Sequence, residues 1–484
     1  FVATDVALAA DLTISDDQTS GVTTATGDGN SAGDIIIDSG GTLELDTGIA
    51  VTINSDNSLT NNGQIQITSE SNAVGVLVDG SVGNITGEIT NNNLISIEGP
   101  ETDSTLIDTA VNNFGIRING PGGLIGSVIN SAGGAIEVGG NASSGLILDT
   151  ALTGSIVNDG RIITIGDNST ALNLNGAITG DISNGGTVNA GGTNSVGMYV
   201  GGAVSGGITN DGVVNAGSSE SRDIEYNIVP EKSGEAGIWI ANSVGSGFLN
   251  SGNRVTEALE PELAADDPAA SMTDAGVSAT GSGPALRIRP GGPSGTLSNI
   301  TLGTVGTGDN AFAILNQGLI STGSSTEGIA SEGIVIEGLV SEGITYSTTL
   351  AGGIRNDGGD VRVGATDASA TTLRIGANAT VPTISNSGDI LAITSDSEED
   401  VNAGTISELG GNATAIIVEE GGSLTSLVNT GMISASAAGS GSSAFAVVDN
   451  AGKLTSFLNT GDVLALIRDG STGTTTALDV RTSK

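Results

Sequence analysis

The residues that could do chemistry in this chain of 484 amino acids are mainly carboxylates. Fifty-four Asp and Glu residues stand against 14 Lys and Arg, and two acidic runs are dense: one contains Asp266 and Asp267, the other Asp396, Glu398 and Asp400. Grouped carboxylate oxygens are ligands that Ca²⁺ prefers. These five residues are therefore candidate calcium ligands, and simple solvation of acidic loops is the alternative interpretation. No other cofactor is expected.

The residue types that are missing narrow the chemistry further. The chain contains no Cys and no His, which removes disulfides, thiolate catalysis, and the commonest metal ligand and general base. The formal net charge is −40, and a field of that sign repels nucleic acid and anionic lipid. No run of residues approaches the ~18 apolar residues of a membrane-spanning helix. We therefore expect neither a nucleic-acid partner nor membrane insertion by this chain.

Three arginines and two aromatic residues occupy equivalent positions of a repeat described below. Arg117, Arg287 and Arg374 are expected to lie several repeats apart, with no Asp or Glu recurring beside them. A catalytic groove of the kind found in polysaccharide-degrading β-helix enzymes is therefore not predicted. We expect no enzyme, and a polysaccharide-degrading β-helix enzyme remains an alternative hypothesis.

Tyr199 and Trp239, the only Trp, fall at the same outward position of consecutive repeats. On an exposed sheet the two rings would be neighbours that could stack on a sugar or on a partner protein. The alternative is that the insertion 218–234 folds back and covers them.

A repeated Asn-x-Gly motif followed by an apolar pair organises the chain. Residues after the motif alternate between apolar and variable types, as in a strand with one buried face. The motif occurs at Asn61, Asn158, Asn184, Asn210, Asn250, Asn316, Asn386, Asn429 and Asn459, with related copies at Asn91, Asn130 and Asn356.

A second signature, apolar-x-apolar, lies about 13 to 16 residues before each Asn. Its outer members are always apolar and its middle residue varies freely, which predicts a strand with one inward face. The predicted inward pairs are Val76/Val78, Ile116/Ile118, Leu146/Leu148, Leu172/Leu174, Met198/Val200, Ile238/Ile240, Leu286/Ile288, Ile334/Ile336, Leu373/Ile375, Ile416/Val418, Phe445/Val447 and Leu478/Val480.

A third short element separates the two signatures, so each repeat holds three short strands with Gly and Asn at its corners. Three strands per repeat without a helix describe one coil of a parallel β-helix, about 26 or more residues long. The fold predicted is an all-β parallel β-solenoid, with a narrow aliphatic core that agrees with 78 Gly and only 2% aromatic residues; its right-handedness is implied by the coil length and by the resemblance given below.

The recurring Asn is predicted to form a structural ladder from coil to coil. Asn tolerates the left-handed backbone expected at a corner, and its amide can bond the Asn residues above and below. The Gly two positions later is expected to relieve the same corner.

The predicted domain organisation is an N-terminal segment, 1–33, acting as a cap or assembly strand, and a continuous solenoid over 34–482. Four insertions interrupt it at 99–113, 218–234, 256–283 and 395–412. All four are expected at one corner of the coil, where they would form a fringe suited to binding or represent tolerated loop growth. Residues 323–353 are expected to form extra strands or an altered coil.

Units such as Gly-Met-Tyr-Val…Gly-Gly-Ile-Thr-Asn-Asp-Gly-Val-Val-Asn-Ala (197–216) resemble passenger domains of Gram-negative autotransporters and related β-helical adhesins. The resemblance covers residues 34–482 and rests on repeat style. It implies a right-handed β-helix exported to the bacterial cell surface or beyond, with a role in adhesion, aggregation or surface coating. The implied partners are a host or neighbouring cell surface, a glycan or a protein.

One departure separates the chain from that family: no segment resembles the aromatic-rich C-terminal translocator. Either that domain was removed or lies beyond Lys484, or the chain is a free-standing surface subunit. The second possibility leads to an alternative function. Unpaired strands at the two ends of the solenoid would pair head to tail, making the chain a self-assembling subunit of a surface filament or surface layer.

Overall fold

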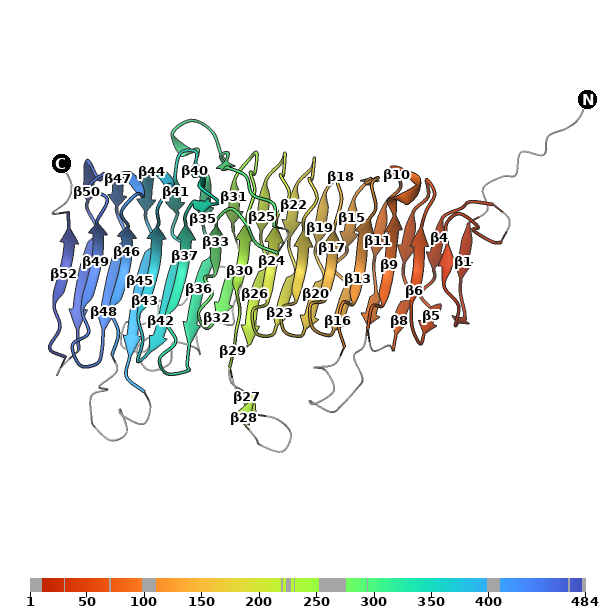
Figure 1. Ribbon diagram of the computed structural model, residues 1–484, viewed down its shortest axis with the longest axis horizontal. Helices are drawn as coiled ribbons and strands as arrows, with labels where there is room; N and C mark the ends of the chain where they lie inside the picture. Colours follow the sequence, from red (N-terminus) through yellow and green to blue (C-terminus); the bar gives the residue numbers. More distant parts are fainter. Residues whose placement is uncertain are drawn as a thin grey trace, which may run out of the picture. The chain divides into compact units, whose positions relative to one another are not determined.

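The computed structural model describes residues 11–29, 31–68, 71–97, 110–218, 221–222, 228–229, 231–251, 276–293, 295–397, 410–468 and 471–480. The chain divides into two compact units, residues 1–190 and residues 191–484. Each unit is a parallel β-solenoid, and each is described by itself. In both units one coil contributes one strand to each of three parallel sheets, here named A, B and C in chain order (Figure 1).

The three sheets of unit 1 are built from strands that pair with the strand one coil earlier and one coil later. Sheet A contains β1 (Leu12–Ile14), β4 (Ile35–Ile37), β7 (Leu59–Asn61), β11 (Ile89–Asn91), β15 (Val128–Asn130), β19 (Ile156–Asn158) and β22 (Ile182–Asn184). Sheet B contains β2 (Asp17–Gln18), β5 (Thr42–Leu45), β8 (Gln64–Ile67), β12 (Leu94–Ile97), β16 (Ala135–Gly139), β20 (Arg161–Ile165) and β23 (Thr187–Gly191). Sheet C contains β3 (Val22–Thr23), β6 (Ile49–Ile53), β9 (Val74–Asp79), β13 (Phe114–Asn119), β17 (Ser144–Leu148) and β21 (Thr170–Leu174). A small sheet of β10 (Ile85–Thr86), β14 (Leu124–Ile125) and β18 (Leu152–Thr153) and a 3₁₀ turn, η1 (Gly80–Val82), complete the unit.

Unit 2 repeats this plan with longer strands toward its C-terminal side. Sheet A contains β25 (Ile208–Asn210), β31 (Phe248–Asn250), β35 (Ile314–Asn316), β41 (Ile354–Asn356), β44 (Ala379–Asn386), β47 (Ser423–Asn429) and β50 (Ser456–Asn459), with β34 (Ile300–Leu302) and β40 (Thr348–Leu350) joined through β44. Sheet B contains β26 (Val213–Ser218), β32 (Gly276–Thr280), β36 (Leu319–Ser324), β42 (Asp360–Thr366), β45 (Asp389–Ser395), β48 (Met432–Ala437) and β51 (Asp462–Ile467). Sheet C contains β24 (Val196–Val200), β30 (Ala236–Ile240), β33 (Leu286–Ile288), β37 (Ser331–Ile336), β43 (Ala370–Ile375), β46 (Ala413–Val418), β49 (Ala444–Asp449) and β52 (Thr475–Asp479).

The predicted inward pairs stack in register, which confirms the β-solenoid. In unit 1 Leu146 pairs with Leu172 in the next coil, and in unit 2 Met198 pairs with Ile238. All four side chains are at most 1% exposed. Each coil therefore closes the core of its neighbour, and burial of aliphatic side chains drives the stacking.

The Asn ladder forms as predicted, in sheet A of each unit. In unit 1 the side-chain amide of each Asn donates to the carbonyl of the next at 2.7–2.8 Å, through Asn61, Asn91, Asn130, Asn158 and Asn184. In unit 2 the corresponding bonds, at 2.7–2.8 Å, link Asn210, Asn250, Asn316, Asn356, Asn386, Asn429 and Asn459. The described ladder side chains are buried except at Asn459, so these hydrogen bonds satisfy polar groups inside the core.

The predicted reason for Asn at this position is wrong. Ladder residues such as Asn158 end a sheet A strand and do not have positive φ; left-handed Asn residues lie elsewhere, before sheet C strands, as at Asn112, Asn168 and Asn194. Asn is required in the ladder because its amide both donates and accepts along the column. The left-handed corner is a separate feature between sheets B and C.

The Gly of the motif is also required for a different reason than predicted. A Cβ on Gly160 would lie 2.1 Å from the carbonyl oxygen of Gly134, and one on Gly186 would lie 1.9 Å from that of Gly160. Neither glycine has positive φ. At these positions Gly allows the backbones of successive corners to approach closely, and the need is for space. Gly358, with φ of 66°, is a motif glycine that does have left-handed geometry.

One predicted inward pair, Phe445/Val447, is out of register by two residues. Val447 pairs with Ile416 and Asp449 pairs with Val418, so the inward pair is Val447 and Asp449. The Asp449 side chain is 2% exposed, and its carboxylate accepts hydrogen bonds from the backbone N–H groups of residues 451–454 at 2.8–3.1 Å. A buried carboxylate is tolerated there because the turn supplies its donors.

The first coil starts within the segment assigned to an N-terminal cap. Strands β1, β2 and β3 pair in parallel with β4, β5 and β6. Residues 12–23 therefore form a complete three-stranded coil ahead of the predicted boundary at residue 34, and residues 1–10 lie outside the described residues. The apolar Leu12 and Ile14 belong to sheet A because they repeat the inward pattern of Ile35 and Ile37.

Three of the four insertions lie between sheets B and C, as predicted. Residues 99–113 come after β12, residues 218–234 begin at the last residue of β26, and residues 395–412 begin at the last residue of β45. The insertion 256–283 does not share that corner. Strand β32 of sheet B lies inside this range, and the described strand before it is β31 of sheet A, so the added residues interrupt the A–B corner. The prediction failed here because no Asn-x-Gly motif directly precedes the strand Gly276–Thr280.

Residues 323–353 add strands outside the regular coil. An antiparallel hairpin of β38 (Leu339–Ser341) and β39 (Ile344–Tyr346) projects between β37 and β40, with Val340 and Ile344 exposed. Smaller additions are β27 (Ser221–Arg222) with β28 (Ile228–Val229), β29 (Lys232–Ser233), and the 3₁₀ turn η2 (Gly308–Asn310). Within the described part of the chain, no helix is long and apolar enough to span a membrane.

Candidate functional site

Tyr199 and Trp239 are adjacent, as predicted, but the surface they would form is covered. They pair in register between β24 and β30, with ring centroids 5.7 Å apart in an edge-to-face arrangement. Tyr199 is 0% exposed and Trp239 is 8% exposed. Of the two alternatives, the exposed aromatic platform is wrong and coverage of the rings is found, because both side chains are buried.

The covering segment is residues 289–293, here called the strap, which follows β33. The Tyr199 hydroxyl donates to the carbonyl of Gly291 at 3.1 Å, and the Trp239 indole N–H donates to the carbonyl of Arg289 at 3.0 Å. These contacts join residues 92 and 50 positions apart in the sequence. The segment predicted to cover the rings, 218–234, is described only in part, and both hydrogen bonds from the rings go to the strap.

The strap fits the rings closely because it carries glycine. Gly292 has φ of 115°, and a Cβ there would lie 2.5 Å from the Tyr199 ring. Tyr199 and Trp239 also pack with Val196, Ala236 and Ala241 in a small buried cluster. The two aromatic residues therefore act as the anchor of a secondary core under the strap.

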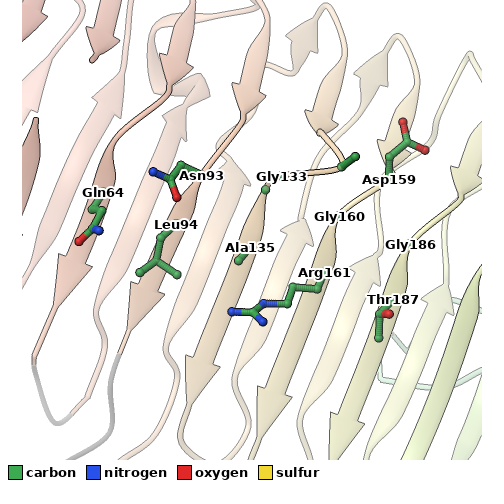
Figure 2. Close-up of a pocket in the computed structure, with 12 residues that line it drawn as sticks. Gln64, Asn93, Leu94, Gly133, Ala135, Asp159, Gly160, Arg161, Gly186 and Thr187 are labelled. Atoms are coloured by element: carbon green, nitrogen blue, oxygen red, sulfur yellow. The ribbon is translucent and has the colours of Figure 1, made fainter. Parts of the chain in front are cut away.

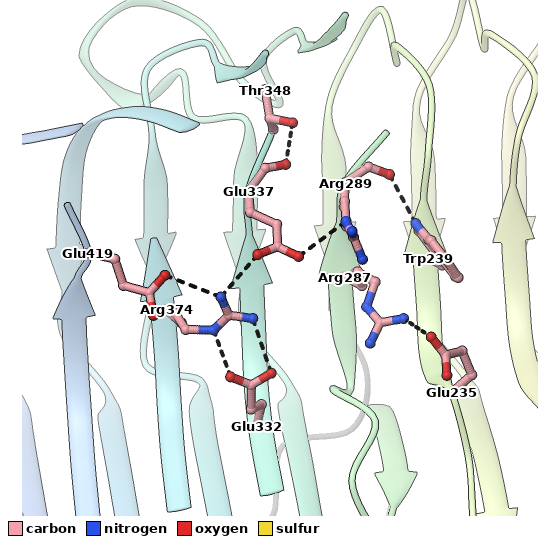
Figure 3. Close-up of polar contacts among 9 residues, drawn as sticks. All are labelled: Glu235, Trp239, Arg287, Arg289, Glu332, Glu337, Thr348, Arg374 and Glu419. Carbon is pink, nitrogen blue, oxygen red and sulfur yellow. Dashed lines mark hydrogen bonds and ion pairs between the residues drawn. The ribbon is translucent and has the colours of Figure 1, made fainter. Parts of the chain in front are cut away.

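An ion-pair network lies beside this cluster on sheet C of unit 2 (Figure 3). The guanidinium of Arg287 lies over the Trp239 ring, 4.8 Å from its centroid, and pairs with Glu235. Arg289 pairs with Glu337 at 3.3 Å. Because Glu337 also pairs with Arg374 at 3.0 Å, it links the strap to the outer surface of β37 and β43.

Arg374 is the centre of the network, with carboxylates on three sides. Its distances to Glu332, Glu337 and Glu419 are 2.6, 3.0 and 3.4 Å. Burial lowers the pKa of Arg374, but its hydrogen bond to Glu332 and the negative charges of Glu332, Glu337 and Glu419 outweigh that effect and raise the pKa above its ordinary value. Arg374 therefore stays charged, and it holds these carboxylates in contacts within the protein.

The expectation that carboxylates do not accompany the outward arginines is wrong. Arg117 pairs with Asp149 at 2.8 Å in unit 1, and Arg287 and Arg374 have the partners named above. Arg287 and Arg374 are also only two coils apart, since both pair with Val335. The partners were missed because Glu332 and Glu337 lie within residues 323–353, which were expected to form extra strands or an altered coil.

The calcium candidates fall mainly outside the described residues: Asp266, Asp267, Glu398 and Asp400 all do. Asp396 is described, and lies directly after β45. Among the described residues, no group of three or more acidic side chains is arranged to hold a metal ion. Calcium binding by the acidic insertions stays a prediction.

No protein-family model matches the chain, and neither the curated proteins nor the solved structures contain a significant match. The β-solenoid architecture is thus established by the coordinates, while the function must be argued from the surface that the coils present.

Proposed function

We propose that the chain is an extracellular structural and adhesive protein of a bacterial surface, whose coils present side chains to a neighbouring cell, a glycan or a protein. The observation that supports the proposal is the contrast between the inner and outer columns of sheet C. The inner column is aliphatic in coil after coil, whereas the outer column of unit 1 reads Leu77, Arg117, Ile147 and Asn173 in register.

This contrast is typical of a scaffold for recognition. The inward residues and the Asn ladder supply the stability, so the outward residues can vary without cost to the fold. Insertions at the B–C corner add further variable surface next to the strands, and loops on a rigid scaffold are common binding elements. The acidic surface keeps such a protein soluble and opposes binding to anionic polymers.

Adhesion is tested with beads coated with the purified full chain and offered to bacterial and epithelial cells. Control beads carry the same chain after heat unfolding, which keeps the charge and removes the folded surface. We expect the folded chain to retain more beads on cells than the unfolded chain. Equal retention by the two would overturn the adhesive role.

The surface location is tested separately, on intact cells that express the protein. Protease added outside the cells is expected to degrade the chain while a cytoplasmic marker survives. A chain that becomes sensitive only after lysis would overturn the extracellular location.

A further inference from the structure

A groove in unit 1 lies over the starts of neighbouring sheet B strands, outside the features described so far (Figure 2). Its volume is about 580 Å³, and it crosses the first residues of β8, β12, β16, β20 and β23. Gln64, Leu94, Ala135 and Arg161 occupy paired positions along it. At ~4.8 Å between adjacent strands, the groove extends roughly 20 Å across the strands.

The groove arises where one corner differs from its neighbours. Asn91 and Leu94 are three residues apart, whereas their partners Asn130 and Ala135 are five apart. The two additional residues belong to the sequence Ser-Ala-Gly-Gly (131–134), of which Ala132, Gly133 and Gly134 line the groove together with Gly160 and Gly186. Small side chains at this corner leave the space open between the larger residues on either side.

The polar side chains at the groove have unused hydrogen-bonding capacity. Gln64 accepts from Gln66 at 2.9 Å, which leaves its amide nitrogen available, and Asn93 donates to the carbonyl of Asn62 at 3.2 Å, which leaves its carbonyl oxygen available. Arg161 pairs with Glu137, yet its side chain is 55% exposed and has further donors. Asp159 adds an exposed carboxylate. The groove therefore offers donors and acceptors side by side.

The backbone of the groove, in contrast, is already used. The N–H groups of Ala135, Arg161 and Thr187 donate to the neighbouring coil at 2.7–2.9 Å. Strand β16 is paired on both sides, with β12 and β20, so a peptide cannot add to the sheet here by strand pairing. Strand addition is therefore closed to a ligand, and the side chains are its main source of recognition.

We propose that this groove binds a linear, uncharged oligosaccharide. A chain of hydroxyl groups can donate to Asp159 and Asn93 and accept from Gln64 and Arg161. Leu94 and the alanines provide little apolar surface, which disfavours an apolar peptide side chain. The net charge of −40 disfavours an anionic glycan. The proposal names a ligand class for the adhesive function and so rests on it, but it can be tested independently of cells.

The test is calorimetric titration of the full chain with cellohexaose, maltohexaose and mannohexaose. Hexagalacturonate and a neutral, Ser- and Gly-rich decapeptide represent the anionic and peptide alternatives. Two variants probe the groove: Ala135→Leu fills it with the residue that the neighbouring coil already accommodates as Leu94, and Arg161→Ala removes its cation. Arg117→Ala is the matched control, since it removes an exposed, ion-paired arginine from sheet C of the same unit.

We expect at least one neutral hexasaccharide to bind, with affinity reduced about tenfold or more by Ala135→Leu and Arg161→Ala and unchanged by Arg117→Ala. The proposal is overturned if none of the neutral sugars binds, if only hexagalacturonate or the peptide binds, or if the groove variants bind as the parent does. Adhesion of the coated beads is scored separately: if no neutral sugar binds and the parent beads still adhere, the groove proposal fails while the adhesive function stands. If a neutral sugar binds and the parent beads do not adhere, the groove proposal stands while the adhesive function fails.

Discussion

Asn158 is bonded on both sides within its column. It accepts from Asn130 and donates to Asn184, in each case at 2.7 Å, and it is 1% exposed. Replacing it by Ala removes both of these buried hydrogen bonds, and each such loss costs about 1–3 kcal/mol.

We therefore expect Asn158→Ala to lower the free energy of unfolding by about 2–4 kcal/mol. Urea unfolding followed by circular dichroism measures the loss. Asn173→Ala, at an outward position of the next sheet C strand, is the control and should change stability by less than about 0.5 kcal/mol. Equal losses in the two variants would contradict a structural role for the ladder.

Asp389 carries an electrostatic cost at neutral pH. Burial raises its pKa, and the negative charge of Asp360 in the neighbouring coil raises it further, while Arg362 lowers it. A carboxyl group whose pKa is higher in the folded than in the unfolded protein binds protons preferentially in the folded state. The folded protein therefore gains stability from this group as the pH falls from neutral through the raised pKa.

Asp389→Asn is expected to be more stable than the parent at neutral pH, because the charge that burial and Asp360 oppose is gone. The difference should shrink as the pH is lowered through the raised pKa of Asp389, where the parent carboxyl takes up its proton. Urea midpoints at several pH values measure it. Asp462→Asn, separated from Asp389 by Met432 in the same column, is the matched control, and an equal gain from that variant would argue against the local cause.

At the scale of the elements, close stacking of corners makes adjacent glycines unequal. A Cβ on Gly186 would lie 1.9 Å from a backbone oxygen, whereas on Gly185 the nearest atom is a side-chain oxygen of Asp159, at 2.7 Å, which can rotate away. We expect Gly186→Ala to cost about 1–3 kcal/mol and Gly185→Ala much less. Thermal unfolding of the two variants compares them, and a similar Tm would show that the corner can relax.

A second comparison uses Gly292, in the strap, and Gly295, just after it; both have positive φ. A Cβ on Gly292 would meet the Tyr199 ring at 2.5 Å, while a Cβ on Gly295 would meet no atom within 4 Å. Gly292→Ala should displace the strap and expose the nearby Trp239, so that acrylamide quenches its fluorescence more strongly. Gly295→Ala should leave quenching unchanged. If Gly292→Ala also leaves it unchanged, the strap does not control access to the rings.

The elements also show what the sequence could predict. Strand positions that repeat were predicted well, because each inward residue and each ladder Asn must match the coil above and below. The strap and the hairpin β38–β39 occur once, so no pattern reveals where they pack. The burial of Tyr199 depends on a contact with Gly291, 92 residues away in the sequence. The inward pair at Phe445/Val447 was predicted in the wrong register because Asp449 occupies an inward position that is apolar in other coils. The groove in unit 1 likewise depends on the length of one corner, and a pattern shared by all coils does not reveal a difference in a single corner.

For the whole molecule, the dominant property is charge. A formal net charge of −40 makes the folded chain repel itself, and salt screens that repulsion over a Debye length of about 10 Å at 0.1 M. We expect Tm to rise when NaCl is increased from about 10 mM to 200 mM. Choline chloride at equal ionic strength controls for specific sodium binding, and a Tm that falls with both salts would indicate that attractive ion pairs outweigh the repulsion.

The spacing of the ladder has a consequence for how such a chain can change length. Asn158 and Asn184 are 26 residues apart, and the strands between them supply one member to each of the three sheets. Duplicating or deleting that stretch in the gene would add or remove one full turn, while the ladder hydrogen bonds and the inward aliphatic contacts of the adjoining coils find equivalent partners. Unequal recombination between repeats can therefore alter the reach of the protein in whole steps, without an intermediate that fails to fold.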